Sequence, residues 1–267
     1  MWTKFWLILL FEALFSPSVC FLQRTCRRRG LYSMMAVDSL MEPHYNDLAE
    51  SLRDKGDGEQ YWVGIAGGPG SGKSTLAAAV AARLGDIAVV LPMDGFHYSR
   101  TELRAIGEAP GSPYSYEDLI ARRGSEWTFD AAALEKCFVA AKATGQAQLP
   151  TYSRQLSDPV PGGVKLLPLH KIVLCEGNYL LNFDDPRWAG LRHLFAETWY
   201  IACPDLSKQR DRLIKRHLET WSEEKTRMWG PGEVGAAAKA DANDVLNAQM
   251  IEAGSRKHAD RIIISLG

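Results

Sequence analysis

A glycine-rich segment that ends in a lysine and two hydroxyl residues carries the strongest chemical signal. Gly67-Gly68-Pro69-Gly70-Ser71-Gly72-Lys73-Ser74-Thr75 has the spacing GxxxxGK[ST]. Glycines let the backbone curl until successive N–H groups face inward, and the N-terminus of a following helix adds partial positive charge. Lys73 can follow the β- and γ-phosphates, and Ser74 can ligate Mg²⁺. Thr75 could share the role of Ser74, or it could only pack the helix. The segment predicts a nucleoside-triphosphate site rather than a plain glycine-rich turn.

Two carboxylates follow apolar runs elsewhere in the chain. Asp94 comes just after residues 87–91, and Glu176 ends residues 171–175. Because ligands of open α/β sheets bind at the carboxyl ends of the strands, we expect both acids near the phosphates. Asp94 could accept a proton from a substrate hydroxyl or hold Mg²⁺ through water, or it could only form an Asx-turn before Gly95. Glu176 could steer Mg²⁺ or a water, or it could be a solvated acid.

The surroundings of these acids narrow the class of phosphate chemistry. A second acid does not follow Glu176, whereas ATPase motors carry an Asp-Glu pair there to polarise water. A GTPase needs a base-reading NKxD segment, and Asn243-Asp244 lacks the flanking lysine. The pattern favours transfer of a phosphoryl group over motor or GTPase activity.

Short apolar runs and helical patterns alternate along the chain. Residues 61–66, 87–91, 171–175, 198–202 and 261–265 read as strands. Helices are expected at residues 35–52, 73–83, 131–143, 206–218 and 241–253, and a long loop at 107–128. This alternation predicts an α/β fold with a parallel sheet covered by helices on both faces.

Four motifs together resemble one family of P-loop kinases. They are PMDGFH (92–97), PTYSR (150–154), LCEGNYLL (174–181) and RLIKRH (212–217). Residues 59–267 resemble the phosphoribulokinase/uridine kinase family, in a branch that touches pantothenate-kinase-like and sugar-kinase-like proteins. The resemblance implies a P-loop NTPase fold with a five-stranded, mostly parallel sheet and a helical lid at about 204–240. It also implies that Asp94 is the catalytic base and that Glu176 is an acid near Mg²⁺.

The resemblance also makes the basic helix part of a lid that closes over the phosphates. Arg212 and Arg216 are four residues apart and share one helix face, although a solvated basic helix would show the same spacing. The chain departs from the family between residues 221 and 242, where 229–238 resemble an insertion into the lid. Candidates for the acceptor pocket could equally be packed aromatics or capping groups; they are His97, Tyr152, Arg154 and Asn178.

These residues predict an ATP- and Mg²⁺-dependent kinase that phosphorylates a hydroxyl of a small metabolite. A sugar, a nucleoside, pantothenate or a similar compound would be the acceptor. One alternative is a P-loop NTP hydrolase or nucleotide-dependent switch without an acceptor. Another is a non-catalytic nucleotide-binding partner protein, which the intact Lys73, Ser74, Asp94 and Glu176 argue against.

Composition limits the partners and the cellular compartment that can be expected for such a protein. The 267 residues are 46% hydrophobic and 24% charged with net charge −1, which is ordinary globular usage and gives no reason to expect a nucleic-acid partner. Five cysteines without a CxxC pair argue against disulfides or zinc and for a reduced compartment. A homo-oligomer is possible.

The N-terminal region has the pattern of a targeting sequence. An apolar run at residues 5–15 precedes a basic stretch at 21–29. Together they resemble a bipartite plastid presequence over residues 1–34. The alternatives are mitochondrial or cytoplasmic localisation, or a simple membrane anchor. Residues 35–58 would then be a leading helix and linker before the kinase domain at 59–267. Since no other run reaches 18 apolar residues, stable membrane association is not expected after processing.

Overall fold

The computed structural model describes residues 40–56 and 58–266. The chain divides into a small unit, residues 1–43 with 266–267, and a large unit, residues 44–265. The expected presequence, residues 1–34, lies outside the described residues. A helix occupies residues 40–53, and its Asn46 accepts a hydrogen bond from Arg83 Nε at 2.7 Å within the large unit.

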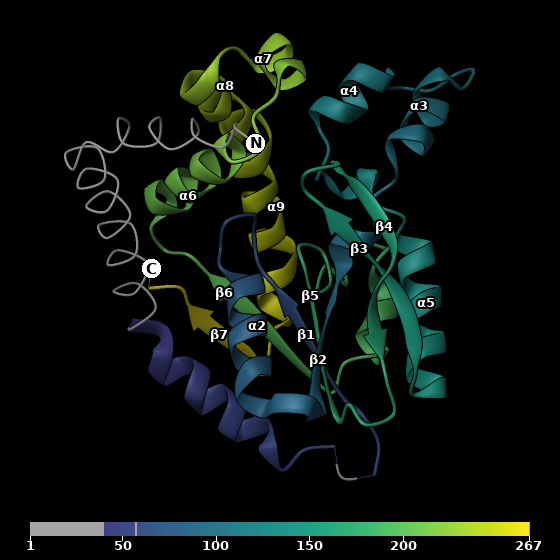
Figure 1. The fold of residues 1–267 in the computed structure, drawn as a ribbon, viewed down its shortest axis with the longest axis vertical. Helices are drawn as coiled ribbons and strands as arrows, with labels where there is room; N and C mark the ends of the chain where they lie inside the picture. Colours follow the sequence, from purple (N-terminus) through teal and green to yellow (C-terminus); the bar gives the residue numbers. More distant parts are fainter. Residues whose placement is uncertain (1–39, 57, 267) are drawn as a thin grey trace, which may run out of the picture. The chain divides into compact units, whose positions relative to one another are not determined.

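A parallel sheet forms the centre of the large unit (Figure 1). Its strands, in spatial order, are β2 (Ala88–Pro92), β5 (Ile172–Gly177), β1 (Tyr61–Ala66), β6 (Glu197–Ala202) and β7 (Arg261–Ile264). Each neighbouring pair runs parallel. The middle strands are buried along nearly their whole length, which explains their continuous apolar sequences. The predicted α/β class with a five-stranded sheet is confirmed, and every strand expected from the sequence is present.

Helices pack against this sheet on both faces because successive strand residues point to opposite sides. Trp62 of β1 belongs to a core cluster with residues of α5 (Ala131–Thr144) and α9 (Val245–Ser255). Its ring meets that of Phe138 edge to face, with centroids 5.8 Å apart. The helix α2 (Lys73–Leu84) packs against β1, β2 and β5. The sheet therefore presents a rigid edge to the loops that follow its strands.

A separate antiparallel hairpin stands beside the sheet. Its strands are β3 (Ala147–Ser153) and β4 (Asp158–Leu166), and β3 packs against a short 3₁₀ helix, η2 (Met93–Phe96), that directly follows β2. Tyr152 lies within β3, although the residues around Pro150 were expected to form a turn; that expectation is wrong. Prolines in both strands, which are rare in sheet interiors, hid the strand pattern.

Helical segments interrupt the region, residues 107–128, that was expected to be a long loop. They are α3 (Arg100–Glu108) and α4 (Tyr116–Ala121), and the loop prediction for residues 107–128 is wrong over α4. Each helix starts with a capping box, built by Ser99 with Glu102 in α3 and by Ser115 with Asp118 in α4. The S-x-x-E/D spacing was visible in the sequence and is a sufficient signal for such starts.

The segment after β6 is a succession of helices. They are α6 (Leu206–Leu218), α7 (Glu223–Trp229), α8 (Gly232–Lys239) and a single π-helical turn, η5 (Ala240–Asp244), that leads into α9. The stretch that departs from the family pattern, residues 221–242, folds as α7, α8 and the first part of η5. Two of its alanines build a small core with α6, whose members are Leu213, Ile214, Ala236 and Ala240. The departing stretch therefore packs against α6, the helix that the resemblance assigns to a lid.

Short 3₁₀ helices complete the connections: η1 (Gly85–Ile87), η3 (Glu126–Thr128), η4 (Ala189–His193) and η6 (Arg256–His258). Across the described residues we find no helix with the length and apolar content that a membrane crossing requires.

Candidate active site

The glycine-rich segment forms the turn between β1 and α2 at the carboxyl edge of the sheet. Gly70 and Gly72 have φ angles of 77° and 95°, which glycine adopts without strain. Space is also limited, because a Cβ on Gly68 would lie 2.8 Å from the Cβ of Ala248 in α9. The turn therefore has the curled backbone, opening onto the N-terminus of α2, that an anion cradle needs.

Lys73, Ser74 and Glu176 meet where this turn approaches the end of β5. Lys73 is 8% exposed and Glu176 6% exposed, and the Ser74 hydroxyl donates to Glu176 Oε2 at 3.0 Å. Burial lowers the pKa of Lys73 and raises the pKa of Glu176, while the attraction between the two charges opposes both shifts. Ser74 and Glu176 present neighbouring oxygens, the donor type that Mg²⁺ takes together with substrate phosphates.

Asp94 is the second residue of η2, which directly follows β2. Pro92 is paired in register with Glu176 across β2 and β5, and the charge of Asp94 acts on the pKa of both Lys73 and Glu176. The side chain is half-buried. Within residues 40–56 and 58–266, hydrogen bonds reach the backbone oxygen of Asp94 and not its carboxylate, so the Asx-turn alternative is not formed. The carboxylate can accept a ligand's hydrogen bond.

Close packing holds η2 in place. A Cβ on Gly95 would lie 2.2 Å from the backbone oxygen of Pro150 in β3. The His97 ring lies between Phe129 and Tyr152, with centroid separations of 3.8 and 4.8 Å, and its Nδ1 is 2.8 Å from the Asp94 carbonyl oxygen. Since a carbonyl only accepts, Nδ1 carries the proton. Burial lowers the pKa of His97, which favours the neutral ring.

The basic helix α6 reaches over the glycine turn. Arg212 Nη1 lies 3.1 Å from the Gly70 carbonyl oxygen and 3.3 Å from Ser265 Oγ. One turn earlier, Gln209 donates to the Pro69 carbonyl oxygen at 2.7 Å. These bonds tie α6 to the phosphate turn. Gln209 was not among the residues expected at the site, although it lies three residues before Arg212 on the same helix face.

Arg216 lies farther along the same face of α6. Burial lowers its pKa, with the charges of Asp244 and Asp94 acting in the opposite direction. Arg216 in turn acts on the pKa of Lys73. Its guanidinium therefore lies within electrostatic reach of the lysine and of Asp94, as the lid interpretation of the basic helix requires.

Three more predicted site residues come from the hairpin and from the position directly after β5. Tyr152 has its pKa raised, mainly by burial and also by the Asp94 charge. Arg154 is exposed at the hairpin turn, and its charge acts on the pKa of Lys73. Asn178 is 8% exposed, and among the described residues its buried Oδ1 has no hydrogen-bond partner. Thr75 is exposed in the first turn of α2.

Arg123 is a structural residue of the site that no sequence pattern indicated. Its side chain is 8% exposed. Nη2 donates to the Tyr98 carbonyl oxygen at 2.7 Å and to Asp158 Oδ1 at 3.0 Å, and Nη1 donates to the Ser157 carbonyl oxygen at 2.5 Å. These bonds fasten the hairpin turn to the segment after η2. No local pattern distinguishes Arg123 from its neighbour Arg122.

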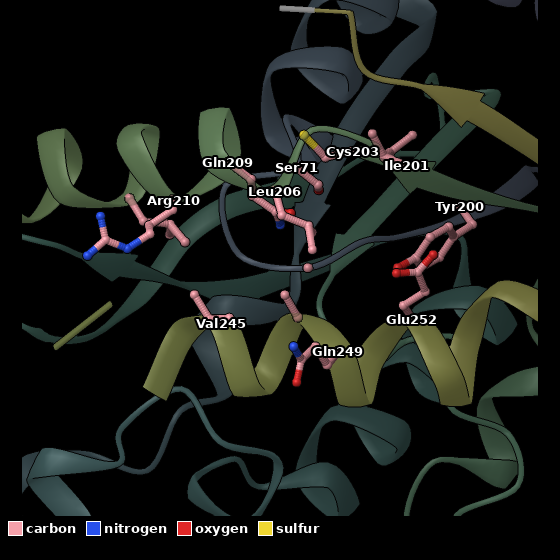
Figure 2. A pocket seen from close by; sticks show the side chains of 13 residues that line it. Ser71, Tyr200, Ile201, Cys203, Leu206, Gln209, Arg210, Val245, Gln249 and Glu252 are labelled. Carbon is pink, nitrogen blue, oxygen red and sulfur yellow. The ribbon is translucent and has the colours of Figure 1, made fainter. Parts of the chain in front are cut away.

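A small cavity lies next to the phosphate turn, between α6, α9 and the end of β6 (Figure 2). Ser71, Cys203 and Gln249 are among its lining residues. Its volume of about 60 Å³ is well below the roughly 300 Å³ at which small-molecule pockets begin. The Ser71 hydroxyl is buried and, among the described residues, has no hydrogen-bond partner. The cavity suits a few waters rather than a nucleotide base.

Comparison with known proteins shows the family. A protein of Schizosaccharomyces pombe named "Putative uridine kinase C227.14" is 34% identical over 218 residues, which cover 78% of this chain and 83% of that protein. The chain belongs to the phosphoribulokinase/uridine kinase family of P-loop kinases. Membership accounts for the phosphate turn, the sheet order and the basic helix as parts of one kinase fold.

Two further proteins that are similar to this P-loop kinase are also named as kinases. "ATP-dependent kinase YFH7" of Eremothecium gossypii is 27% identical over 239 residues, covering 79% of this chain and 67% of its own. The crystal structure of a "putative fructose transport system kinase" from Silicibacter sp. TM1040 matches with TM-score 0.66 and 30% identity, over 82% of this chain and 98% of that one.

At the level of fold alone, the crystal structure of YFH7 from Saccharomyces cerevisiae has TM-score 0.65 at 19% identity, over 84% of this chain and 98% of that one. No family model matches the chain.

Proposed function

We propose that this P-loop kinase transfers the γ-phosphate of ATP to a hydroxyl of a small metabolite. The observation that carries the proposal is the buried Lys73 of the phosphate turn, beside Glu176, which accepts a hydrogen bond from the neighbouring Ser74 hydroxyl at 3.0 Å. The charge of Asp94 also reaches this lysine. A buried cation at the phosphate turn, beside a carboxylate that accepts no hydrogen bond from the part of the chain that the structure describes, suits a triphosphate on one side and a hydroxyl on the other. The printed names of two relatives, a uridine kinase and a fructose transport system kinase, refer to compounds that carry hydroxyls.

In this proposal each residue has a defined task. The N–H groups of the glycine turn and Lys73 bind the β- and γ-phosphates, and Arg212 and Arg216 approach from α6. Ser74 and Glu176 would hold Mg²⁺, which neutralises phosphate charge when bound. Excluding water under the lid favours transfer over hydrolysis.

Asp94 acts on the acceptor. The acceptor oxygen forms a bond to the γ-phosphorus, its proton passes to the Asp94 carboxylate, and the bond from that phosphorus to the β,γ-bridging oxygen breaks to leave ADP. His97 and Tyr152 would form one wall of the acceptor site, with Arg154 at its entrance. Asn178 Oδ1, which lacks a partner among the described residues, can accept a hydrogen bond from a further hydroxyl or from an amide.

The competing function is ATP hydrolysis without an acceptor. ADP release by the full chain should be measured alone and with a panel of sugars, nucleosides and pantothenate, followed by a metabolite extract, with Lys73→Ala as the inactive control. We expect at least one acceptor to stimulate ADP release and to gain one phosphate by mass spectrometry. A rate that is the same with and without every acceptor, and no phosphorylated metabolite from the extract, would contradict the proposal.

A further inference from the structure

The buried carboxylate of Asp244 lies in the π-helical turn η5, at the base of the lid. It is 7% exposed, accepts from His217 Nε2 at 2.7 Å and lies 3.9 Å from Arg216 Nη2. The charge of Lys239 from α8 also acts on it. π-Helical turns are rare and often mark functional positions. One acid in this turn therefore contacts two basic side chains of α6 and lies within reach of the charge of a lysine from α8.

The position of Arg216 depends on nearby anions that offset repulsion from neighbouring positive charges. The positive charges of Arg154 and Lys73 face the same space, and like charges held close together repel. Asp94 attracts Arg216 from the phosphate side, and Asp244 attracts it from the lid side. The 3.9 Å separation from Asp244 involves one guanidinium nitrogen, and no other ion pair of Arg216 is found among the described residues. The other N–H groups can therefore bind a ligand.

We propose that Asp244 is a positioning residue whose carboxylate holds the Arg216 guanidinium towards the γ-phosphate of bound ATP. The inference rests on the proposed function, because it assigns Arg216 to the nucleotide. The binding of His217 to one carboxylate oxygen fixes the orientation of Asp244, and so of the oxygen that faces Arg216. Asp244 does not touch the reacting groups; it acts through Arg216.

The same turn supplies a matched control. Asp241, three residues earlier in η5, pairs with Arg210 of α6 through two hydrogen bonds of 2.5 and 2.7 Å. Asp241→Asn therefore weakens a contact between the same two elements without touching Arg216. Any effect of Asp244→Asn that Asp241→Asn shares would come from loosening α6 against η5.

The test compares affinities of the full chain for ADP and for the non-hydrolysable analogue AMP-PNP, both with Mg²⁺, by calorimetry. The ratio of the two dissociation constants isolates the γ-phosphate. We expect Asp244→Asn to reduce the preference for AMP-PNP by about tenfold, the value of one charge-assisted hydrogen bond. Arg216→Gln should reduce it at least as much, the combination of the two no further, and Asp241→Asn not at all.

The outcomes separate this inference from the proposed function. An unchanged preference in Asp244→Asn, or additive losses in the double variant, overturns the positioning role. Wild-type protein that binds AMP-PNP but transfers phosphate to no acceptor contradicts the proposed function and leaves the binding test readable. Arg216→Gln with an unchanged preference removes Arg216 from the γ-phosphate and overturns the inference.

A second variant answers the case in which Asp244→Asn does not fold. Asp244→Asn combined with Lys239→Met removes one charge of each sign from the base of the lid. A lost AMP-PNP preference in that variant supports positioning. A retained preference shows that Asp244 only neutralises Lys239, and it overturns the proposal.

Discussion

Gly95→Ala should disturb catalysis through the packing of η2 against the hairpin. The new Cβ would meet the Pro150 carbonyl oxygen at 2.2 Å, its carbon at 2.5 Å and the Thr151 nitrogen at 2.9 Å, against 3.4–4 Å for ordinary contact. All three are backbone atoms, so no side chain can swing away. The residue directly before Gly95 is Asp94, which must move with η2.

The distances set the size of the effect. Relieving the contact requires η2 and β3 to separate by roughly 1 Å, because repulsion rises steeply below van der Waals distance. Misplacing a reacting group by that amount can lower turnover by about 10²-fold. Overpacking a tight contact costs about 1–3 kcal/mol of unfolding free energy, which corresponds to a fall in melting temperature of roughly 2–12 °C for a unit of this length.

The assay is acceptor-dependent ADP release, paired with a thermal melt. Gly190→Ala is the control, since its new Cβ would meet the Glu135 carboxylate, the end of a flexible side chain that can move. We expect turnover to fall in Gly95→Ala and to stay near wild type in Gly190→Ala. Wild-type turnover and melting temperature in Gly95→Ala would refute the idea that the hairpin fixes Asp94.

Two further predictions concern pH and the lid. Burial lowers the pKa of His97, so the unfolded chain takes up its proton first and stability falls as pH drops below the usual histidine value of about 6.5. His97→Asn, which retains an N–H for the Asp94 carbonyl, should lose less stability to urea between about pH 6.5 and 5 than the wild type does. The control His44→Asn, at an exposed position, should lose as much as the wild type. The same dependence of stability on pH in both variants would contradict the prediction. Arg100 Nη2 lies 2.5 Å from Glu224 Oε1 and joins α3 to α7. Because both side chains are partly exposed, Glu224→Gln should change the free energy of unfolding by less than about 1 kcal/mol. It should nevertheless raise the ratio of acceptor-independent ATP hydrolysis to phosphoryl transfer, because water enters the site; an equal ratio in a Glu223→Gln control would contradict a role of the Arg100–Glu224 pair in excluding water.

The sheet and the phosphate turn could be predicted because their signals are local. Apolar runs such as residues 61–66 specify buried strands, and the glycine spacing up to Lys73 specifies the turn that follows. The bounds of α6 were predicted to the residue, since an N-cap aspartate, Asp205, precedes a helical pattern of charges. Both acids lie at the strand ends where the topology of parallel sheets requires them.

The hairpin and the bracing contacts depend on partners distant in sequence. Pro150 gives no local strand signal, because its strand is stabilised by β4 and by packing on η2. Gln209 meets Pro69 across 140 residues, and Arg123 meets Asp158 across 35. Hydrophobic periodicity carries no information about such polar pairs, so only the folded chain identifies them.

The most direct measurement of the proposed chemistry is phosphoryl transfer by Asp94→Asn, with the acceptor found in the panel, alongside AMP-PNP affinity. The substitution keeps the shape of the side chain and removes the group that takes the proton. We expect transfer to fall by about 10²–10⁴-fold while AMP-PNP affinity and melting temperature stay near wild type. Transfer at the wild-type rate by a folded Asp94→Asn protein would contradict the role of Asp94 as the base.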